Sequence, residues 1–267
     1  MISYTKGVHQ LELADFSIEL LSLLFLVAVL AGLLDTLAGG GGLISLPALI
    51  LSGVPPLAAL GTNKLQGSMG TATATYIMLK NKKIHWHNVK HIMLTAFIGA
   101  IIGTIAVQFI NTDVLTFVIP VVLLFIAIYF LISPKIAQKK EKSKLTESQY
   151  KNTVVPFIGF YDGMFGPGTG SFFALSGVSC QGQDLITSTA IAKALNFSTN
   201  IASLIVFVIA GQIVWAIGIL MIFGQILGAW LGSHLLFKIN PTHLRRVVVL
   251  MCCCMLIKYA HSMGWFG

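Results

Sequence analysis

The sequence predicts an all-α polytopic membrane protein, and three observations support this fold class. Of its 267 residues, 56% are hydrophobic and only 10% are charged, whereas a soluble domain carries about 25% charged residues. Apolar blocks recur along the chain, many of them at about the 20-residue length that a helix needs to cross a bilayer. The net charge of +8 comes from lysines and arginines gathered between those blocks, near residues 80–90, 135–151 and 238–246. This pattern is typical of multi-pass membrane proteins. The composition excludes a cytosolic enzyme, a nucleic-acid binder and a disordered chain.

Ten apolar segments predict the helices, in chain order. Eight are long and fall near residues 18–38, 57–79, 90–110, 114–133, 153–166, 185–209, 213–236 and 243–262. Most of these reach membrane-spanning length, whereas 153–166 falls short of it. Two further segments, 43–53 and 170–180, would extend only about 16 Å each, roughly half a membrane. Each follows a glycine-rich break, at 39–42 and 166–170, so we expect broken helices there. The first block lacks the basic start and cleavage site of a signal peptide, so we expect it to be retained.

The two halves of the chain resemble each other. Asp35 and Asp162 are 127 positions apart, and five further matching pairs are each 129 positions apart. Those five are Lys64 and Lys193, Trp86 and Trp215, Gly99 and Gly228, Gly103 and Gly232, and Asn111 and Asn240. Such self-similarity at a fixed spacing indicates an internal duplication. We therefore expect a first transmembrane repeat at 1–133, a basic linker at 134–152 and a second transmembrane repeat at 153–267.

Loop charges indicate that the two repeats are inverted. The basic loop 80–90 corresponds at this spacing to 209–219, which contains no charged residue. The basic stretch 238–246 corresponds to 109–117, in which Asp113 is the only charged residue. Because the charge bias swaps sides, the repeats are predicted to have opposite orientations, each with four long helices and one half-length broken helix. The linker would then be cytoplasmic and both termini periplasmic, in a multi-pass protein of the cell inner membrane.

Four ionisable residues lie well inside apolar segments, namely Asp35, Lys64, Asp162 and Lys193. Each costs about 2.5–3.5 kcal/mol within a bilayer, so each needs a reason to be there. Each aspartate shortly precedes a glycine-rich break, and each lysine lies in a polar patch of the following helix. The functional interpretation is an anion site at the membrane midplane, where lysines of inverted repeats would converge. The breaks would add N–H groups at half-helix N-termini, and Asp35 and Asp162 could couple transport to protons.

This interpretation defines the candidate substrate-binding residues. They are Lys64, Lys193, Asn63, Thr62, Gln66, Asn196, Ser198, Asn200, Gly40, Gly41, Gly42, Gly168, Thr169 and Gly170. A structural alternative is that each aspartate pairs with the lysine of its own half, so that the ion pairs only pin the broken helices. Both can hold together, with a lysine neutralised by an aspartate until substrate displaces it. Neither interpretation requires a metal or a cofactor.

Glycine and tryptophan patterns have structural interpretations. Gly99 and Gly103, like Gly228 and Gly232, have the small-xxx-small spacing of closely packed membrane helices. Three tryptophans fall at block ends and would act as interfacial anchors. These are Trp86, Trp215 and Trp265.

Cysteine and histidine residues do not indicate catalysis. The adjacent residues 252–254 and the single Cys180 have no metal-ligand spacing, and neighbours on a helix point in different directions. They are therefore expected to pack within helices. His85, His87 and His91 form the only histidine cluster, near the basic loop, and resemble a metal site only loosely. Because no nucleophile or zinc motif is present, we expect that the protein is not an enzyme.

The glycine-rich breaks and the polar patches together resemble a known family. The run from Gly32 to Gly42, followed by Pro47 and by Gly61-Thr62-Asn63-Lys64, is similar to the first repeat of the TauE/SafE sulfite exporter family. The run 159–170, with Ala192-Lys193 and Asn196, is similar to that family's second repeat, although it carries Pro167 and Thr169 among its glycines. The resemblance covers almost the whole chain. It implies a permease, also described as a toluene-sulfonate uptake permease, for sulfur-containing anions such as sulfite, sulfoacetate or aromatic sulfonates.

The sequence therefore favours a secondary transporter whose partners are a small anionic substrate and the lipid bilayer, and it leaves a homo-oligomer open. Within transport, the alternative is a carrier of another small anion, or of a cation bound by Asp35 and Asp162. The two carboxylates are matched by two lysines, so no acidic residue is left unpaired to bind a cation. A non-transport accessory subunit would not need symmetric buried charges. A membrane enzyme would need a nucleophile–base pair or a metal cluster at membrane depth.

Overall fold

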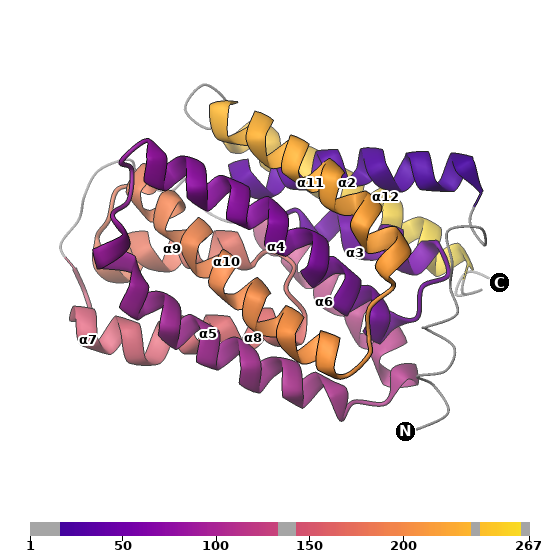
Figure 1. Cartoon of the computed structure of the whole chain (residues 1–267), viewed down its shortest axis with the longest axis horizontal. Coiled ribbons are helices and arrows are strands. Elements are labelled where there is room, and N and C mark those ends of the chain that lie inside the picture. The colour runs from indigo at the N-terminus through magenta and orange to yellow at the C-terminus, as the bar shows by residue number, and fades with distance from the viewer. Residues whose placement is uncertain (1–16, 133–142, 236–240, 263–267) are drawn as a thin grey trace.

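The computed structural model describes residues 17–132, 143–235 and 241–262, and within these ranges the chain forms helices without strands. The elements are α2 (Ile18–Ala38), α3 (Gly42–Leu51), α4 (Pro56–Lys80), α5 (Trp86–Gln108), α6 (Thr112–Ile132), α7 (Glu147–Gln149), the π-helix η2 (Tyr150–Val154), α8 (Val155–Met164), α9 (Thr169–Gln181), α10 (Leu185–Ile209), α11 (Trp215–Leu235) and α12 (Pro241–Ser262). Figure 1 shows them as one helical bundle. The all-α prediction is confirmed. Five of the described helices, α2, α5, α6, α10 and α11, are long and apolar enough to cross a membrane.

Helix boundaries follow from capping residues and glycine breaks. α2 begins after Ser17, whose hydroxyl accepts the N–H of Leu20 at 3.3 Å, and ends at Gly39, whose φ of +70° turns the chain. α10 begins after Asp184, whose carboxylate accepts the N–H of Thr187 at 2.9 Å. The observed bounds agree with the predicted segments to within a few residues, except at the start of the second half.

The first helix of the second half begins earlier than the predicted block 153–166. Thr146 and Gln149 form a capping box, in which each side chain accepts the other residue's backbone N–H. Helical structure therefore starts at Glu147, inside the predicted linker 134–152, and continues through η2 into α8. The polar residues of these first turns conceal the helix from a search for apolar blocks.

The two most extensive helix contacts among the described elements join one half of the chain to the other. α2 packs along α11, and α5 packs along α8. Gly99 and Gly103 lie against backbone carbonyls of α8, so that a Cβ at either position would collide with them. Gly228 and Gly232 lie in the same way against backbone carbonyls of α2. The predicted role of these glycines in close helix packing is confirmed.

The central helices α4 and α10 pack against each other, and each also packs against the short helix that precedes it, α3 or α9. In Figure 1, α2 and α3 lie toward the right-hand end of the bundle, whereas α7 and α9 lie toward the left. The same order of elements holds on both sides of the linker: a helix, a glycine break, a short helix and three long helices. The duplication and its inversion stay predictions.

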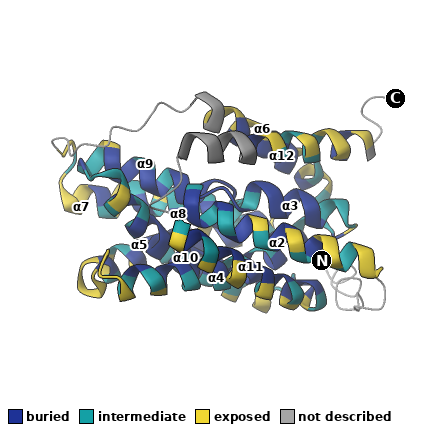
Figure 2. Cartoon of the chain, turned by 90° about the horizontal axis from the view of Figure 1, so that it is seen from above, coloured by how far each residue is buried: buried dark blue, intermediate teal, exposed yellow. Residues whose placement is uncertain are grey.

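Apolar side chains cover outer faces of the bundle. Figure 2 shows exposed residues on the outward faces of the helices and buried residues between them. On α5 the exposed set repeats every three or four residues and consists of Leu94, Ile98, Ile102 and Ile105. Extensive exposed apolar surface indicates contact with something other than water, and lipid fits this pattern. Trp86 and Trp215 are exposed at the first residues of α5 and α11, whereas Trp265 lies outside the described residues.

The adjacent cysteines of α12 point in different directions, as predicted. Cys252 is buried, Cys253 is half-buried and Cys254 is exposed. A common ligand or disulfide partner could not be reached by all three from one helix.

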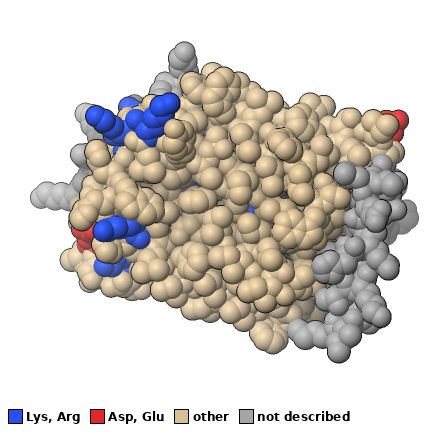
Figure 3. All heavy atoms as spheres, in the orientation of Figure 1, with Lys and Arg blue, Asp and Glu red and all other residues tan. Residues whose placement is uncertain are grey.

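Lysines of the described loops gather at one end of the bundle. They are Lys80, Lys82, Lys83 and Lys90 around the α4–α5 loop, and Lys144 and Lys151 before α8. Figure 3 shows basic side chains at the left-hand end, while the rest of the described surface on this face carries few charges. α2 begins toward the opposite end (Figure 1). Residues 134–142 of the predicted linker, together with Lys238 and Asn240, lie outside the described residues.

Candidate functional site

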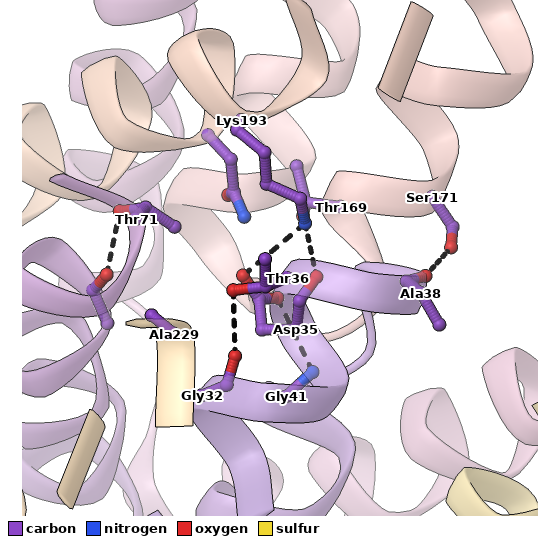
Figure 4. A network of polar contacts seen from close by, with 12 residues as sticks. Gly32, Asp35, Thr36, Ala38, Gly41, Thr71, Thr169, Ser171, Lys193 and Ala229 are labelled. Carbon is purple, nitrogen blue, oxygen red and sulfur yellow. Dashed lines mark hydrogen bonds and ion pairs between the residues drawn. The ribbon is translucent and has the colours of Figure 1, made fainter. Parts of the chain in front are cut away.

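The two glycine-rich breaks lie against each other. A Cβ at Gly39 would collide with the backbone of Gly170 and Ser171. The hydroxyl of Ser171 donates a hydrogen bond to the carbonyl of Ala38 (Figure 4). Gly39, with φ +70°, and Gly168, with φ +81°, adopt the left-handed conformation that glycine tolerates best. Direct contact between the breaks therefore brings the ends of α2 and α8 together.

Each buried lysine forms an ion pair with the aspartate of the other half. Lys64 Nζ on α4 lies 3.0 Å from Asp162 Oδ1 on α8. Lys193 Nζ on α10 lies 3.7 Å from Asp35 Oδ2 on α2. The alternative prediction, in which each aspartate pairs with the lysine of its own half, is therefore wrong. Contact between the two breaks is the reason, because it places each aspartate beside the opposite lysine-bearing helix.

Asp35 has a partner for each of its carboxylate oxygens. Oδ1 accepts the N–H of Gly41 at 3.4 Å, and Oδ2 faces Lys193. Lys193 also donates a hydrogen bond to the backbone carbonyl of Asp35 (Figure 4). The Asp35 side chain, which is 18% exposed, thus connects α10 to the end of α2 and to the break before α3.

The ion pair between Lys64 and Asp162 is more deeply buried and less completely satisfied. Both side chains are only 1% exposed. Asp162 Oδ2 accepts no hydrogen bond from the described residues, and Lys64 Nζ makes none besides its ion pair. Gly166, with φ +93°, leaves space beside the pair, because a Cβ there would lie 3.0 Å from Lys64 Nζ. This pair therefore retains unused capacity to donate and to accept hydrogen bonds.

A polar cavity adjoins the ion pairs. Its volume is about 30 Å³, enough for one or two water molecules. It is lined by Asp35, Gly41, Gly42, Ser45, Asn63, Lys64, Gly67, Thr71, Asp162, Gly166, Asn196, Asn200 and Gln225. Apart from the glycines, every one of these residues carries a polar or charged side chain. A ligand in this cavity would therefore contact polar side chains and backbone almost exclusively.

Among the residues that α4 and α10 contribute to the site, each helix has a set of three, and the two sets have the same spacing along the sequence. The residues are Lys64, Gly67 and Thr71 on α4, and Lys193, Asn196 and Asn200 on α10. Positions i, i+3 and i+7 share one face of a helix. Each lysine therefore belongs to a helix face that continues along the cavity for two further turns.

Most of the predicted polar residues lie at or next to this cavity. Those that line it are Asp35, Gly41, Gly42, Asn63, Lys64, Asp162, Asn196 and Asn200. Lys193 is held beside it by Asp35. Gln66 supports Asn63 by donating from Nε2 to Asn63 Oδ1 at 3.1 Å. Gly40, Gly168 and Gly170 belong to the breaks but do not line the cavity.

Three predicted residues use their hydroxyl groups elsewhere. Thr62 Oγ1 accepts the N–H of Val214 at 3.0 Å, which joins α4 to the residue before α11. Ser198 donates to the carbonyl of Met93 on α5 at 2.7 Å. Thr169 donates to a carbonyl of its own break at 2.7 Å. These bonds hold the helices that position the site.

Four lining residues were not identified from the sequence, namely Ser45, Gly67, Thr71 and Gln225, and a fifth, Gly166, belongs to the predicted break but was not among the candidate substrate-binding residues. Gln225 is the most informative of them. It is 3% exposed in the middle of α11, and its Oε1 lies close to Gly32 and Gly70. A lone carboxamide inside the apolar block 213–236 is the signal that could have identified it, because polar groups are costly there.

His87 and His91 line a second cavity of about 630 Å³ at the Lys-rich end. Glu147, Lys151 and Gln183 also line it. Within the described ranges, no group of three or more His, Cys, Asp or Glu residues could hold a metal ion. The two histidines therefore share a cavity of mixed polar and apolar lining, without a metal site among the described residues.

Known proteins resemble this chain over nearly its full length. Residues 24–259 match the family model described as "Sulfite exporter TauE/SafE". A "Probable membrane transporter protein" of Haemophilus influenzae is 40% identical over 252 residues, which cover 94% of this chain and 99% of that protein. The "Probable membrane transporter protein YfcA" of Escherichia coli K12 is 38% identical, over 93% of this chain and 94% of that protein. A "Probable membrane transporter protein ORF9" of a Sinorhizobium species is 41% identical, over 82% and 84%. No solved structure matches the chain.

Proposed function

This chain belongs to the TauE/SafE sulfite exporter family, and we propose that it is a secondary transporter of small sulfur-containing anions such as sulfite, sulfoacetate or organosulfonates. Its relatives are named as membrane transporters, and it is a multi-pass membrane protein with five described helices of spanning character. The proposed substrate class is supported by the chemistry of the cavity.

One observation carries the proposal: two buried lysines flank a cavity lined by polar residues and glycines, and each lysine is neutralised by a carboxylate from the other half. A sulfite or sulfonate group presents oxygen acceptors like those of a carboxylate, so it can replace one at an ammonium group. The remaining oxygens would accept hydrogen bonds from carboxamides and from backbone N–H groups at the break before α3. The carboxamides concerned are those of Asn63, Asn196 and Asn200.

The size of the cavity implies movement during transport. About 30 Å³ holds one or two waters but no sulfonate, so the helices around it must separate to admit substrate. The ion pairs connect α4 to α8 and α10 to α2. Substrate that replaces a carboxylate would release one of these connections and allow the surrounding helices to shift, as alternating access requires.

The two ion pairs beside the cavity favour an anion over a cation as the transported substrate. Asp35 and Asp162 each face an ammonium group. A cation bound by these carboxylates would leave a buried lysine without its counter-charge, which is strongly unfavourable. An anion avoids this conflict when the aspartate that releases its lysine takes up a proton and becomes neutral.

The proposed orientation places the Lys-rich end in the cytoplasm. Basic loops are retained on the cytoplasmic side of bacterial inner membranes, and the described loop lysines lie together at one end (Figure 3). The linker would then be cytoplasmic, and the start of α2 would lie on the periplasmic side.

Anion-dependent thermal stabilisation of the detergent-purified protein tests the proposal. The panel comprises sulfite, sulfate, thiosulfate, sulfoacetate, taurine, methanesulfonate, toluenesulfonate, chloride and acetate. A ligand at a hundred times its Kd adds about 2.7 kcal/mol to the stability of the folded protein. We expect a shift with one or more sulfur oxyanions or sulfonates. The variants Lys64→Ala and Lys193→Ala should reduce it, and the exposed control Lys80→Ala should not. Equal stabilisation by chloride and acetate, or equal shifts in all three variants, would contradict the proposal.

A further inference from the structure

We propose that Asp162 is the proton-binding group of this transporter and that Asp35 stays ionised, so that one proton binds with each anion at the pair formed by Lys64 and Asp162. The inference rests on the proposed function, because it assigns separate roles to the two ion pairs of the same site. It depends on differences between those pairs in hydrogen bonding, burial and position.

Asp35 has a donor beside each of its carboxylate oxygens. Both of its carboxylate oxygens are partnered, by the N–H of Gly41 and by Lys193. Lys193 is held a second time by the Asp35 backbone carbonyl. Because an ionised carboxylate is an acceptor only, these two donors favour its charged form. A proton on Asp35 would displace one of them and weaken the connection between α2, α10 and the break.

Asp162 has an oxygen that a proton can occupy without displacing any partner. Oδ1 faces Lys64, whereas Oδ2 is buried and accepts no hydrogen bond from the described residues. A buried charged group with an unsatisfied oxygen is destabilised. Protonation at Oδ2 would convert this oxygen into an O–H donor. Because Asp162 lines the polar cavity, that O–H could donate to water or substrate there.

Protonation of Asp162 makes anion binding at the site more favourable. The two lysines and two aspartates of the site balance in charge before the proton binds, and afterwards Lys64 has lost the carboxylate charge 3.0 Å from it, so the site carries one net positive charge. Such a charge is strongly unfavourable, and Lys64 Nζ has no other hydrogen bond to hold it. A monoanion in the cavity restores neutrality. The proton stays on the Asp162 carboxyl, the ammonium keeps its three protons, and no covalent bond is made or broken other than the new O–H.

Few charged groups surround Asp162 on the described elements packed against α8. Lys64 reaches it from α4, Tyr161 is its neighbour in sequence, and Lys193 lies on α10 with Asp35 as its partner. On α5 the contacts are small residues and the hydroxyl of Thr104, which donates to the carbonyl of Gly163 at 3.0 Å. The titratable residues of α5 lie in its first two turns, and α9 has none before its final turns. They are His87, Lys90 and His91 on α5, and Cys180 on α9, and η2, which also packs against α8, carries Tyr150 and Lys151.

Anion affinity measured as a function of pH tests the assignment. The probe is whichever of methanesulfonate or toluenesulfonate stabilises the wild-type protein more, because each is a monoanion whose charge does not change between pH 5 and 8. Wild-type affinity should fall by up to tenfold per pH unit above the pKa of the proton-binding group. Proton uptake on binding, measured in weakly buffered solution, should approach one per anion. Asp162→Asn imitates the protonated carboxyl, so its affinity should be independent of pH and its proton uptake should vanish.

The matched variant Asp35→Asn distinguishes the two pairs. It should keep both the pH dependence and the proton uptake, even if its stability is lower. Should Asp162→Asn not fold, Asp162→Glu is expected to shift the midpoint of the pH profile, and Asp35→Glu is expected to leave it in place. If an anion binds the wild type without proton uptake, or if Asp35→Asn abolishes the uptake, this inference is overturned and the proposed function stands. If none of the panel anions binds, the proposed function itself fails.

Discussion

Asn200 on α10 donates a hydrogen bond to the hydroxyl of Thr71 on α4, with Nδ2 3.4 Å from Oγ1. The two residues are 129 positions apart, the same spacing that separates Lys64 from Lys193. Each lies two helical turns beyond its lysine, so the contact marks the place where equivalent faces of α4 and α10 meet. A hydrogen bond of this length is weak, as the proposed movement of one helix against the other requires.

Gly166→Ala should lose both stability and anion binding, whereas a strained glycine variant away from the cavity should lose stability alone. Its φ of +93° is strained for any L residue, and the new Cβ would lie 3.0 Å from Lys64 Nζ. The control is Gly182→Ala, which has comparable backbone strain at φ +63° but lies at the C-cap of α9, away from the cavity. Both variants should lose about 1–3 kcal/mol of stability. Only Gly166→Ala should lose anion-dependent stabilisation, and equal losses would contradict a role for this loop in the site.

Gln225→Leu should reduce anion affinity by about tenfold or more. The side chain lines the cavity, and a hydrogen bond to a charged group contributes about 1.5–3 kcal/mol. Leucine fills a similar volume, so the fold should persist. Met221→Leu, at a fully buried position one turn earlier on α11, provides a control that should bind anions normally. Titration of each purified variant against the stabilising anion measures the difference. Unchanged affinity in Gln225→Leu would remove this residue from the site.

Thr62→Val should lower the stability of the protein, whereas Asn63→Ala, at the adjacent position, should lower its anion affinity. Thr62→Val leaves the buried N–H of Val214 without its acceptor, which costs about 1–3 kcal/mol. Its melting temperature should fall while its anion affinity stays at the wild-type value. Asn63→Ala removes a cavity-lining carboxamide and should lower the affinity. The opposite pattern would show that Thr62, and not Asn63, contacts the substrate.

Gly103→Ala and Gly228→Ala should each destabilise the protein. The added Cβ would collide with the carbonyl of Phe160 in the first case and of Val29 in the second, and overpacking of this kind costs about 1–3 kcal/mol. Ile98→Val removes one methylene from an exposed position of α5 and should change the melting temperature little. Thermal unfolding in one detergent compares the three variants. Wild-type stability in both glycine variants would contradict the packing described for these helices.

The helices could be predicted from the sequence because their signals are local. Apolar runs bounded by charge or glycine determined nearly every segment to within a few residues, and the breaks at 39–42 and 166–170 were identified by composition alone. Helical structure from Glu147 escaped prediction, because its start depends on a capping box and a π-helical turn within polar sequence.

The pairing of charges could not be predicted in the same way. Asp35, Lys64, Asp162 and Lys193 were identified because charge is costly in lipid. Which carboxylate meets which ammonium depends on how the two breaks lie against each other, and no local pattern encodes that contact. Gln225 escaped prediction because its carboxamide is uncharged, and its place at the cavity depends on how α11 packs against α2 and α4.

The packing of α2 and α8 against helices of the other half determines whether either half of the chain can fold alone. α2 finds its most extensive packing partner in α11, and α8 finds its own in α5, so each half exposes a glycine-lined groove when the other is missing. Two polypeptides produced by cutting the chain within residues 133–142 should therefore fail to fold separately. Made together in one cell, they should complement each other and restore the ion pairs that only their association creates.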